Sequence, residues 1–133
     1  MREHDLYTQI AQYMQYHHKS VIYRFDLAAD LKLSIGQARK HKALHPNRGY
    51  PDLLIAEPRG EHHALFIELK RPGTRIYKKD GTLVADQHIR EQFDMLEELR
   101  RKGYVAEFAC GFDEAKEIID NYLGRPYANE EIF

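Results

Sequence analysis

The sequence predicts a small mixed α/β domain in which helices flank a β-sheet. Apolar residues recur at helical spacing in several segments, and short runs rich in β-branched and aromatic residues lie between them. The 133 residues are the length of one domain. We therefore expect a single domain over 1–133, with a loosely held acidic tail over 124–133.

The first half of the chain predicts two helices and a strand between them. Apolar spacing indicates an amphipathic helix over 3–18, and the β-branched and aromatic run 20–26 indicates a strand. A short helix is expected over 34–44 with Ser34 as its N-cap. Gly49-Tyr50-Pro51 then ends the helical pattern.

The second half predicts a strand pair followed by helix, strand and helix. The apolar runs 52–57 and 64–70 flank a turn and should pair antiparallel. An Asp-Gly turn within 74–85 indicates a smaller, exposed hairpin. A long helix should begin after Asp86 and stop at Gly103. A last strand and helix are predicted over 104–109 and 113–123, respectively.

Composition excludes several classes of protein. The formal net charge of −1 excludes a strongly basic, histone-like binder, although it permits a local basic patch. Cys110 is the only cysteine, so neither an intramolecular disulfide nor a cysteine-rich zinc site is possible. No apolar run approaches the roughly 20 residues that span a bilayer, and we expect a cytoplasmic protein. His41 and His45 have i,i+4 spacing, but no HExxH motif accompanies them and no zinc site is expected.

One of three acid-x-lysine triplets combines the right residue types with a strand. The triplet 114–116 falls in a helical pattern, where residues i and i+2 diverge, and 30–32 lies in a polar connection. Glu68 and Lys70 lie in an apolar strand and project from one face. Such a triplet alone is usually a surface acid with a strand-end ion pair.

Pairing of the two runs would bring Asp52 to the same end of the sheet as Glu68 and Lys70. Two carboxylates beside a lysine suit a hard divalent cation that keeps some of its water ligands. The lysine can hold or deprotonate a water that attacks a phosphorus atom. This arrangement favours metal-dependent phosphodiester hydrolysis over the structural interpretation.

Two further polar residues fall on inward helix faces. Gln92 lies in the apolar stripe of the long helix, where a buried amide needs partners. It can orient a ligand or the lysine, or bond a neighbouring backbone. On the first helix, Glu3 shares the inward face and Asp5 the polar face, so Glu3 is the first candidate for a further metal ligand and Asp5 the reserve. Both could instead be favourable charges at a helix N-terminus.

Two acid-free basic stretches, 37–48 and 70–79, flank this cluster in sequence. Such charges hold phosphate backbones, and an aromatic residue among them can stack on a base. A single charge run is usually a solvated loop, but two around a metal-type cluster favour nucleic acid. The candidate DNA-binding residues are Arg39, Lys40, Lys42, Arg48, Arg71, Arg75, Tyr77, Lys78 and Lys79.

Three segments together resemble the virus-type replication-repair nuclease (VRR-NUC) domain of the PD-(D/E)xK nuclease superfamily. They are Gly49 to Asp52 (GYPD), Phe66 to Gly73 (FIELKRPG), and Glu91-Gln92 followed by Leu96, Leu99 and Gly103. The resemblance extends from the first helix to the last strand. It implies a restriction-endonuclease-like core and an Mg²⁺- or Mn²⁺-dependent phosphodiesterase.

The resemblance also implies roles for individual residues. Asp52 and Glu68 would ligate the metal together with the Leu69 carbonyl, Lys70 would position the water, and Gln92 would match the family's helix glutamine. The family's early acid would be Glu3 or Asp5, with Glu3 the first candidate as a metal ligand. Stand-alone members of this size resemble phage-encoded homodimers that cut branched DNA, which implies the cytoplasm of a bacterial or phage-infected cell. The segment 26–46 would then serve dimerisation or DNA contact.

The leading interpretation is therefore a structure-selective DNA endonuclease that acts as a homodimer, with four-way (Holliday) junctions as a candidate substrate. A flap nuclease, an exonuclease or a restriction-type nuclease of the same superfamily is the second. A catalytically silent nucleic-acid-binding module is the third, and it is disfavoured because every catalytic residue type is present. RNA remains open as a substrate.

Overall fold

The computed structural model describes residues 3–26 and 32–124, without the side chains of Glu3 and His4. Of the predicted tail over 124–133, residues 125–133 lie outside the described residues. The elements follow the predicted order, α-β-α-β-β-α-β-α. They are α1 (Glu3–His17), β1 (Tyr23–Phe25), α2 (Ile35–Leu44), β2 (Leu53–Ile55), β3 (Leu65–Lys70), α3 (Gln87–Arg101), β4 (Val105–Cys110) and α4 (Phe112–Leu123).

The four strands form one mixed sheet in the order β1-β2-β3-β4. β2 and β3 pair antiparallel across the predicted turn, and β1 pairs antiparallel with β2. β4 lies parallel to β3, which requires α3 as the crossover between them. β1 is shorter than the predicted strand over 20–26 because its ladder with β2 is only three residues long.

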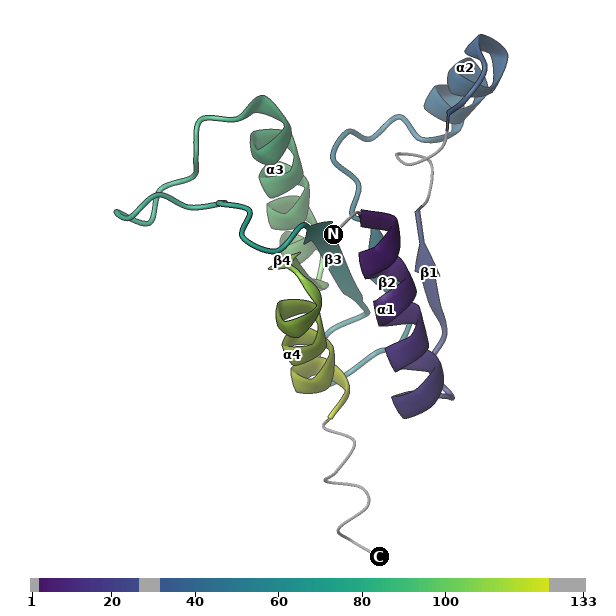
Figure 1. Ribbon diagram of the computed structural model, residues 1–133, viewed down its shortest axis with the longest axis vertical. Coiled ribbons are helices and arrows are strands. Elements are labelled where there is room, and N and C mark those ends of the chain that lie inside the picture. Colours follow the sequence, from purple (N-terminus) through teal and green to yellow (C-terminus); the bar gives the residue numbers. More distant parts are fainter. Residues whose placement is uncertain (1–2, 27–31, 125–133) are drawn as a thin grey trace, which may run out of the picture.

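Helices cover both faces of the sheet (Figure 1). α1 and α4 lie together on one face, where the larger core packs around Leu6, Ile10, Leu53, Ile67 and Ile119. α3 covers the other face with a smaller core. Side chains of β3 alternate between the two layers because successive residues in a strand point to opposite faces. As a result β3 is buried on both sides.

Local signals begin and end the helices where the sequence predicts. The Ser34 hydroxyl accepts a hydrogen bond from Gln37 N at 3.1 Å, and the Gln37 side chain accepts one from Ser34 N at 2.9 Å, which together form a capping box. The Asp86 carboxylate caps α3 by accepting from Ile89 N. Gly103 follows the end of α3 with a φ of +97°, which favours glycine.

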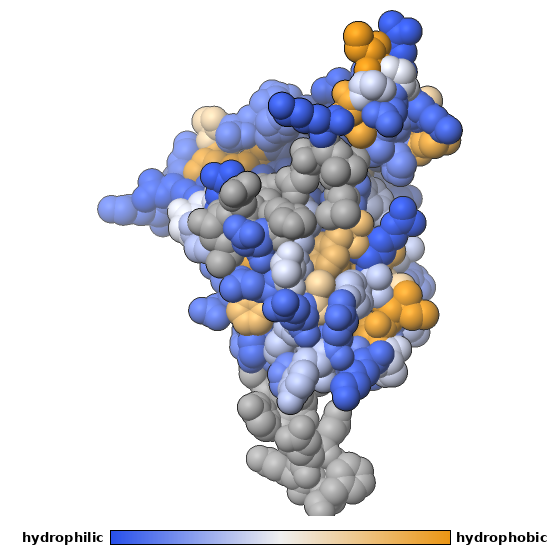
Figure 2. Space-filling model, turned by 45° about the vertical axis from the view of Figure 1, so that its right-hand side comes forward, coloured by the Kyte–Doolittle hydropathy of each residue, from blue (hydrophilic) through white to orange (hydrophobic). Residues whose placement is uncertain are grey.

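α2 projects away from the sheet (Figure 1), and none of its residues is buried. It exposes two large apolar side chains, Ile35 and Leu44. Hydrophobic surface is visible at this end of the molecule in Figure 2. Tertiary packing therefore contributes little to α2, and its capping box matters more for its stability.

The predicted exposed hairpin is present between β3 and α3. Lys78 N donates to Thr82 O and Val84 N donates to Ile76 O, which closes a turn around Asp80-Gly81. The hairpin extends from the body of the molecule on the side opposite α2 (Figure 1). Within the described part of the chain, no helix is long and apolar enough to cross a membrane.

Candidate active site

The β2–β3 register brings the predicted acids to one end of the sheet. Leu53 pairs with Ile67, so continuing the register by one residue places Asp52 opposite Glu68. Both carboxyl groups are buried, with exposed fractions of 9% for Asp52 and 3% for Glu68. They line a hollow of about 500 Å³, which we call the central hollow. The hollow is lined by Asp26, Lys42, Arg48, Gly49, Tyr50, Asp52, Glu68, Lys70, His88, Glu91 and Gln92.

Glu68, Lys70 and Gln92 reach the central hollow from two elements. Glu68 and Lys70 are two residues apart in β3 and project from the same face of the sheet. On α3, Ile89 and Leu96 are buried against this face, and Gln92 lies on the same side of the helix. The Gln92 amide Nε2 donates to Glu68 Oε1 at 2.9 Å. The amide therefore fixes the Glu68 carboxylate, and its own oxygen Oε1 has no hydrogen-bond partner among the described atoms.

The Asp52 carboxyl group is held by donors from two sides. Leu69 N donates to Asp52 Oδ2 at 2.9 Å, and the Tyr7 hydroxyl of α1 faces the same carboxyl group as a donor. Burial raises the pKa of Asp52. The two donors, a hydrogen bond with Glu68 and the positive charge of Lys70 all act to lower this pKa, but they do not offset the effect of burial. A buried carboxyl group whose charged form is disfavoured by burial, beside a second buried carboxyl group, forms a place where a cation is stabilising.

The backbone of Leu69 also faces Asp52. Lys70 O accepts from Gly111 N beside β4, and backbone groups of neighbouring strand residues point to alternate sides. The N–H and C=O of Leu69 therefore both point toward β2. The register extended from Leu53 places Pro51 opposite Leu69, and proline has no N–H to donate to its carbonyl.

Gly49 allows the loop before β2 to pack directly on α3. Its φ is +74°, and a Cβ atom there would lie 2.7 Å from Glu91 O and 3.0 Å from the Gln92 Cα. No other residue type fits this approach without movement of the backbone. Glycine at this position therefore sets the spacing between the Asp52 and Gln92 sides of the central hollow.

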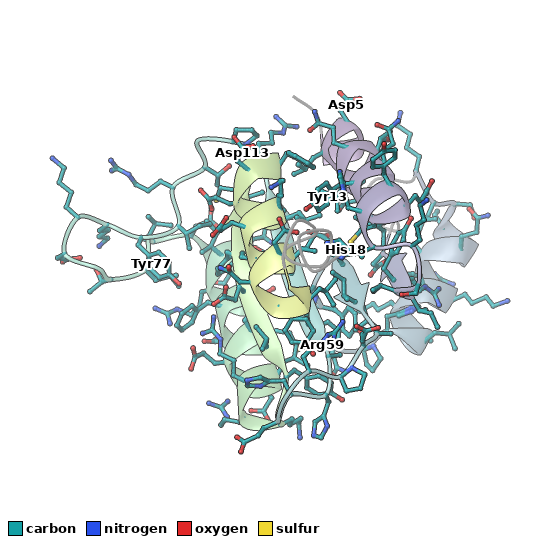
Figure 3. The ribbon with its side chains drawn as sticks, turned by 90° about the horizontal axis from the view of Figure 1, so that it is seen from below. Asp5, Tyr13, His18, Arg59, Tyr77 and Asp113 are labelled. Atoms are coloured by element: carbon teal, nitrogen blue, oxygen red, sulfur yellow. The ribbon has the colours of Figure 1, made fainter. Side chains whose placement is uncertain are left out.

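The expected early acid lies outside what the structure describes. Glu3 is the first residue of α1, but its side chain is not described. Asp5, the reserve candidate, is exposed and does not line the central hollow (Figure 3). Among the described side chains, no three His, Cys, Asp or Glu residues converge closely enough to hold a metal ion. Asp52 and Glu68 are thus a pair of carboxylates, not a complete ligand set.

The basic stretches lie on two sides of the central hollow. Lys42 and Arg48 line it, and Arg48 Nη1 is 3.5 Å from Glu91 Oε1. The other predicted basic residues are exposed and do not line it. Arg39 and Lys40 lie on α2, whereas Arg71, Arg75, Tyr77, Lys78 and Lys79 lie in the segment that leads to the hairpin and in the hairpin itself. Figure 1 shows these segments projecting in opposite directions.

Sequence reasoning missed Tyr7, Asp26 and Tyr50 as neighbours of this site. Tyr7 had a signal, because it lies three residues before Ile10 and seven before Met14 in the buried stripe of α1. A sequence signal also existed for Asp26, because it is an acid at the end of a predicted strand. Its backbone N donates a hydrogen bond to Asp52 O. In the sequence, Tyr50 belongs to the segment that ends a helical pattern and to the GYPD motif, and neither of these indicates that its ring lines the site.

A solved structure described as "VRR_NUC domain protein" is similar to this fold. The TM-score is 0.50 with 32% sequence identity, and the match covers 65% of this chain and 62% of that protein. The chain has a VRR-NUC-type fold. This confirms the predicted family resemblance and the α/β class, and it indicates a nuclease-type domain. The match spans less than two thirds of that protein's length. No protein-family model and no curated protein matches the chain.

Proposed function

We propose that the chain is an Mg²⁺- or Mn²⁺-dependent DNA endonuclease that hydrolyses phosphodiester bonds in branched DNA. One observation carries this proposal: three separate segments of the chain place Asp52, Glu68, Lys70 and Gln92 on the lining of one open hollow. The VRR-NUC-type fold around them supports it.

The residues at the central hollow fit a hard divalent cation. The carboxylates of Asp52 and Glu68 and the carbonyl of Leu69 would be its ligands, with water and a substrate phosphate completing the shell. Glu3 remains the candidate for a further ligand from α1. A bound Mg²⁺ or Mn²⁺ would stabilise the negative charge that develops on the phosphate during hydrolysis.

The chain's own residues would position the reactants. Leu69 N and the Tyr7 hydroxyl orient the Asp52 carboxylate, and the Gln92 amide orients that of Glu68. Lys70 is half-buried at the end of β3 and lines the same hollow. Its ammonium group would hold the attacking water or, once deprotonated, accept its proton.

Charge and shape support DNA as the substrate. Lys42 and Arg48 border the central hollow, and further basic side chains lie on α2 and on the hairpin. A duplex arm held on each side would place the branch point near the acids. Ile35 and Leu44 offer apolar surface on α2 to a second copy. A twofold homodimer would present two such sites to a symmetric four-way junction.

The decisive experiment is a cleavage assay on a labelled four-way junction, a flap, a single strand and a linear duplex. Each would be incubated with Mg²⁺, Mn²⁺ or EDTA. We expect metal-dependent cutting of the junction, abolished by Lys70→Ala with DNA binding retained. Lys19→Ala, which removes an exposed lysine in the turn after α1, is the matched control and should cut normally.

Other outcomes select among the alternatives. Cutting of the flap or single strand alone would retain the catalytic site but change the function to end processing. Cutting that persists in EDTA or in Lys70→Ala would contradict the proposed chemistry. Binding without any cutting would favour the silent nucleic-acid-binding module.

A further inference from the structure

A second cavity of about 520 Å³ lies beside the central hollow, between α2 and strands β1 and β2. We call it the side pocket. Its walls are mainly rings and aliphatic side chains, with a few polar groups. It is lined by Arg24, Phe25, Asp26, Leu33, Gln37, His41, His45, Tyr50, Pro51, Asp52 and Leu54. None of the catalytic residues proposed above except Asp52 belongs to it.

The side pocket adjoins the central hollow. Asp26, Tyr50 and Asp52 line both of them. A group bound in the side pocket would therefore lie next to a phosphate held at Asp52. In a DNA strand, the groups adjacent to a phosphate are the neighbouring sugars and their bases.

The side pocket offers flat ring surfaces of the kind on which bases stack. His41 and His45 stack on each other, with ring centroids 4.3 Å apart and an interplanar angle of 22°. Tyr50 is 42% exposed, and its ring meets Phe66 edge to face at 5.6 Å. The two rings are nearly perpendicular, and the 42% exposure of Tyr50 leaves part of its ring accessible to a stacking partner. Stacking of this kind accepts any base, because every base has a π-face.

The polar groups at the side pocket match the edge of a base. His41 Nε2 is buried with no hydrogen-bond partner among the described atoms, so a ligand can satisfy it. Asp26 and Arg24 add an acceptor and a set of donors. The volume is within the usual range of small-molecule sites, about 300–1,000 Å³.

We propose that the side pocket receives one unstacked nucleobase adjacent to the scissile phosphate. A base inside an intact duplex cannot reach it without leaving the stack, which costs free energy. The preferred substrate is therefore DNA with an unpaired nucleotide at the cut site, as occurs at a branch point or single-strand boundary. This inference rests on the proposed nuclease function, but it can be tested without cleavage.

The test measures binding in EDTA, where no cutting is expected. Three fluorescent duplexes would be compared by anisotropy: one fully paired, one with a single unpaired thymidine, and one with an abasic residue in its place. We expect the unpaired thymidine duplex to bind about tenfold more tightly than the abasic duplex, the effect of one base–aromatic stack. Tyr50→Ala should remove this preference, whereas Tyr50→Phe should keep it.

Two further variants make the test specific. Tyr16→Ala removes a tyrosine that is 74% exposed on α1 and should leave the preference unchanged. Leu33→Trp should fill the side pocket and abolish the preference without removing any ring, which provides a second test if Tyr50→Ala folds poorly. Equal binding of the thymidine and abasic duplexes by the wild type would overturn the proposal. So would a preference that survives both Tyr50→Ala and Leu33→Trp.

The proposed function and this inference can fail separately. If Lys70→Ala cuts normally while the thymidine preference depends on Tyr50, the catalytic assignment is wrong and the side pocket proposal is unaffected. If Lys70→Ala is inactive but the wild type does not discriminate between the two probes, the side pocket proposal fails and the catalytic assignment is unaffected.

Discussion

Two regions of this molecule bury carboxyl groups, and they do so in different ways. Asp52 and Glu68 lie side by side at an open hollow, with few donors between them. Asp120 is buried between α1 and α4, with an exposed fraction of 2%. Its carboxylate accepts hydrogen bonds from the Tyr13 hydroxyl at 2.5 Å and the Lys116 ammonium at 3.2 Å, and it pairs with His18 Nε2 at 3.2 Å.

The pKa directions follow from these surroundings. Burial raises the pKa of Asp52, and the available donors do not offset it. Burial also acts to raise the pKa of Asp120, but the hydrogen bonds from Tyr13, His18 and Lys116 outweigh it and the pKa is lowered. Burial alone therefore does not mark an active site. A buried acid whose donors do not offset its burial, beside open space, is a candidate for one.

The largest expected effect comes from neutralising the acid at the central hollow. Asp52→Asn keeps the size of the side chain and an oxygen that can accept from Leu69 N. We expect cleavage to fall by about 10³-fold or more, because a metal ligand is weakened where charge develops. The melting temperature in EDTA should stay equal or rise, because an amide removes a carboxyl group whose charged form is disfavoured by burial. A clear fall in melting temperature would mean that Asp52 is structural.

The matching change at Asp120 should show the opposite pattern. Asp120→Ala deletes the acceptor of three buried or half-buried donors and should lower the free energy of unfolding by about 2–4 kcal/mol. Where the protein remains folded, activity per folded molecule should be retained. Urea unfolding measures the first quantity and titration of active sites the second. Asp94→Ala, at an exposed carboxylate on α3, should change stability by less than about 0.5 kcal/mol.

Two glycine substitutions separate the effect of backbone strain from the effect of the close contact between Gly49 and α3 beside the central hollow. Gly49 and Gly60 both have positive φ. A Cβ atom added at Gly49 would collide with the Glu91 backbone, whereas a Cβ atom added at Gly60 would have no neighbouring atom within 4 Å among the described residues. Gly60→Ala should cost about 1 kcal/mol from conformation alone. Gly49→Ala should cost about 1–3 kcal/mol more and also reduce cleavage, because α3 and Gln92 must move. Equal effects of the two variants on cleavage would show that the close approach is unimportant.

The smallest expected effect is on how the free energy of unfolding of wild type and of Asp120→Asn differs at acidic pH. Asp120 has a lowered pKa, so its stabilisation is complete above its usual pKa near 3.8 and is lost as pH falls through the lower folded-state value. The stability difference between wild type and Asp120→Asn should therefore be constant from pH 7 to about pH 5 and shrink below about pH 4. Urea titrations across that range measure it. A difference that grows on acidification would reverse the assigned sign.

Much of the fold and the proposed catalytic set could be read from local sequence patterns. Ser34 and Asp86 cap their helices through side chains that reach only three residues along the chain. The proximity of Asp52 to Glu68 follows from a short antiparallel connection, in which register is determined by neighbouring residues. Gln92 follows from a 3.6-residue period, which places it on the buried side of α3.

Other features depended on contacts between distant elements. Tyr13 and Asp120 are 107 residues apart, and no local pattern links them; Figure 3 shows Tyr13 and His18 between α1 and α4. The side pocket likewise forms only because α2 lies over the end of β1, next to Tyr50.

The sequence by itself thus determined the order of elements, their caps and the acid–lysine–glutamine set, because periodicity and chain connectivity dictate these. Only the tertiary structure decided which acids are stabilised by donors, where the Tyr7 and Asp26 side chains lie, and that a second cavity adjoins the first. Those properties depend on how separate faces pack in space, since burial and hydrogen-bond partners are set by groups that the chain brings together from far apart.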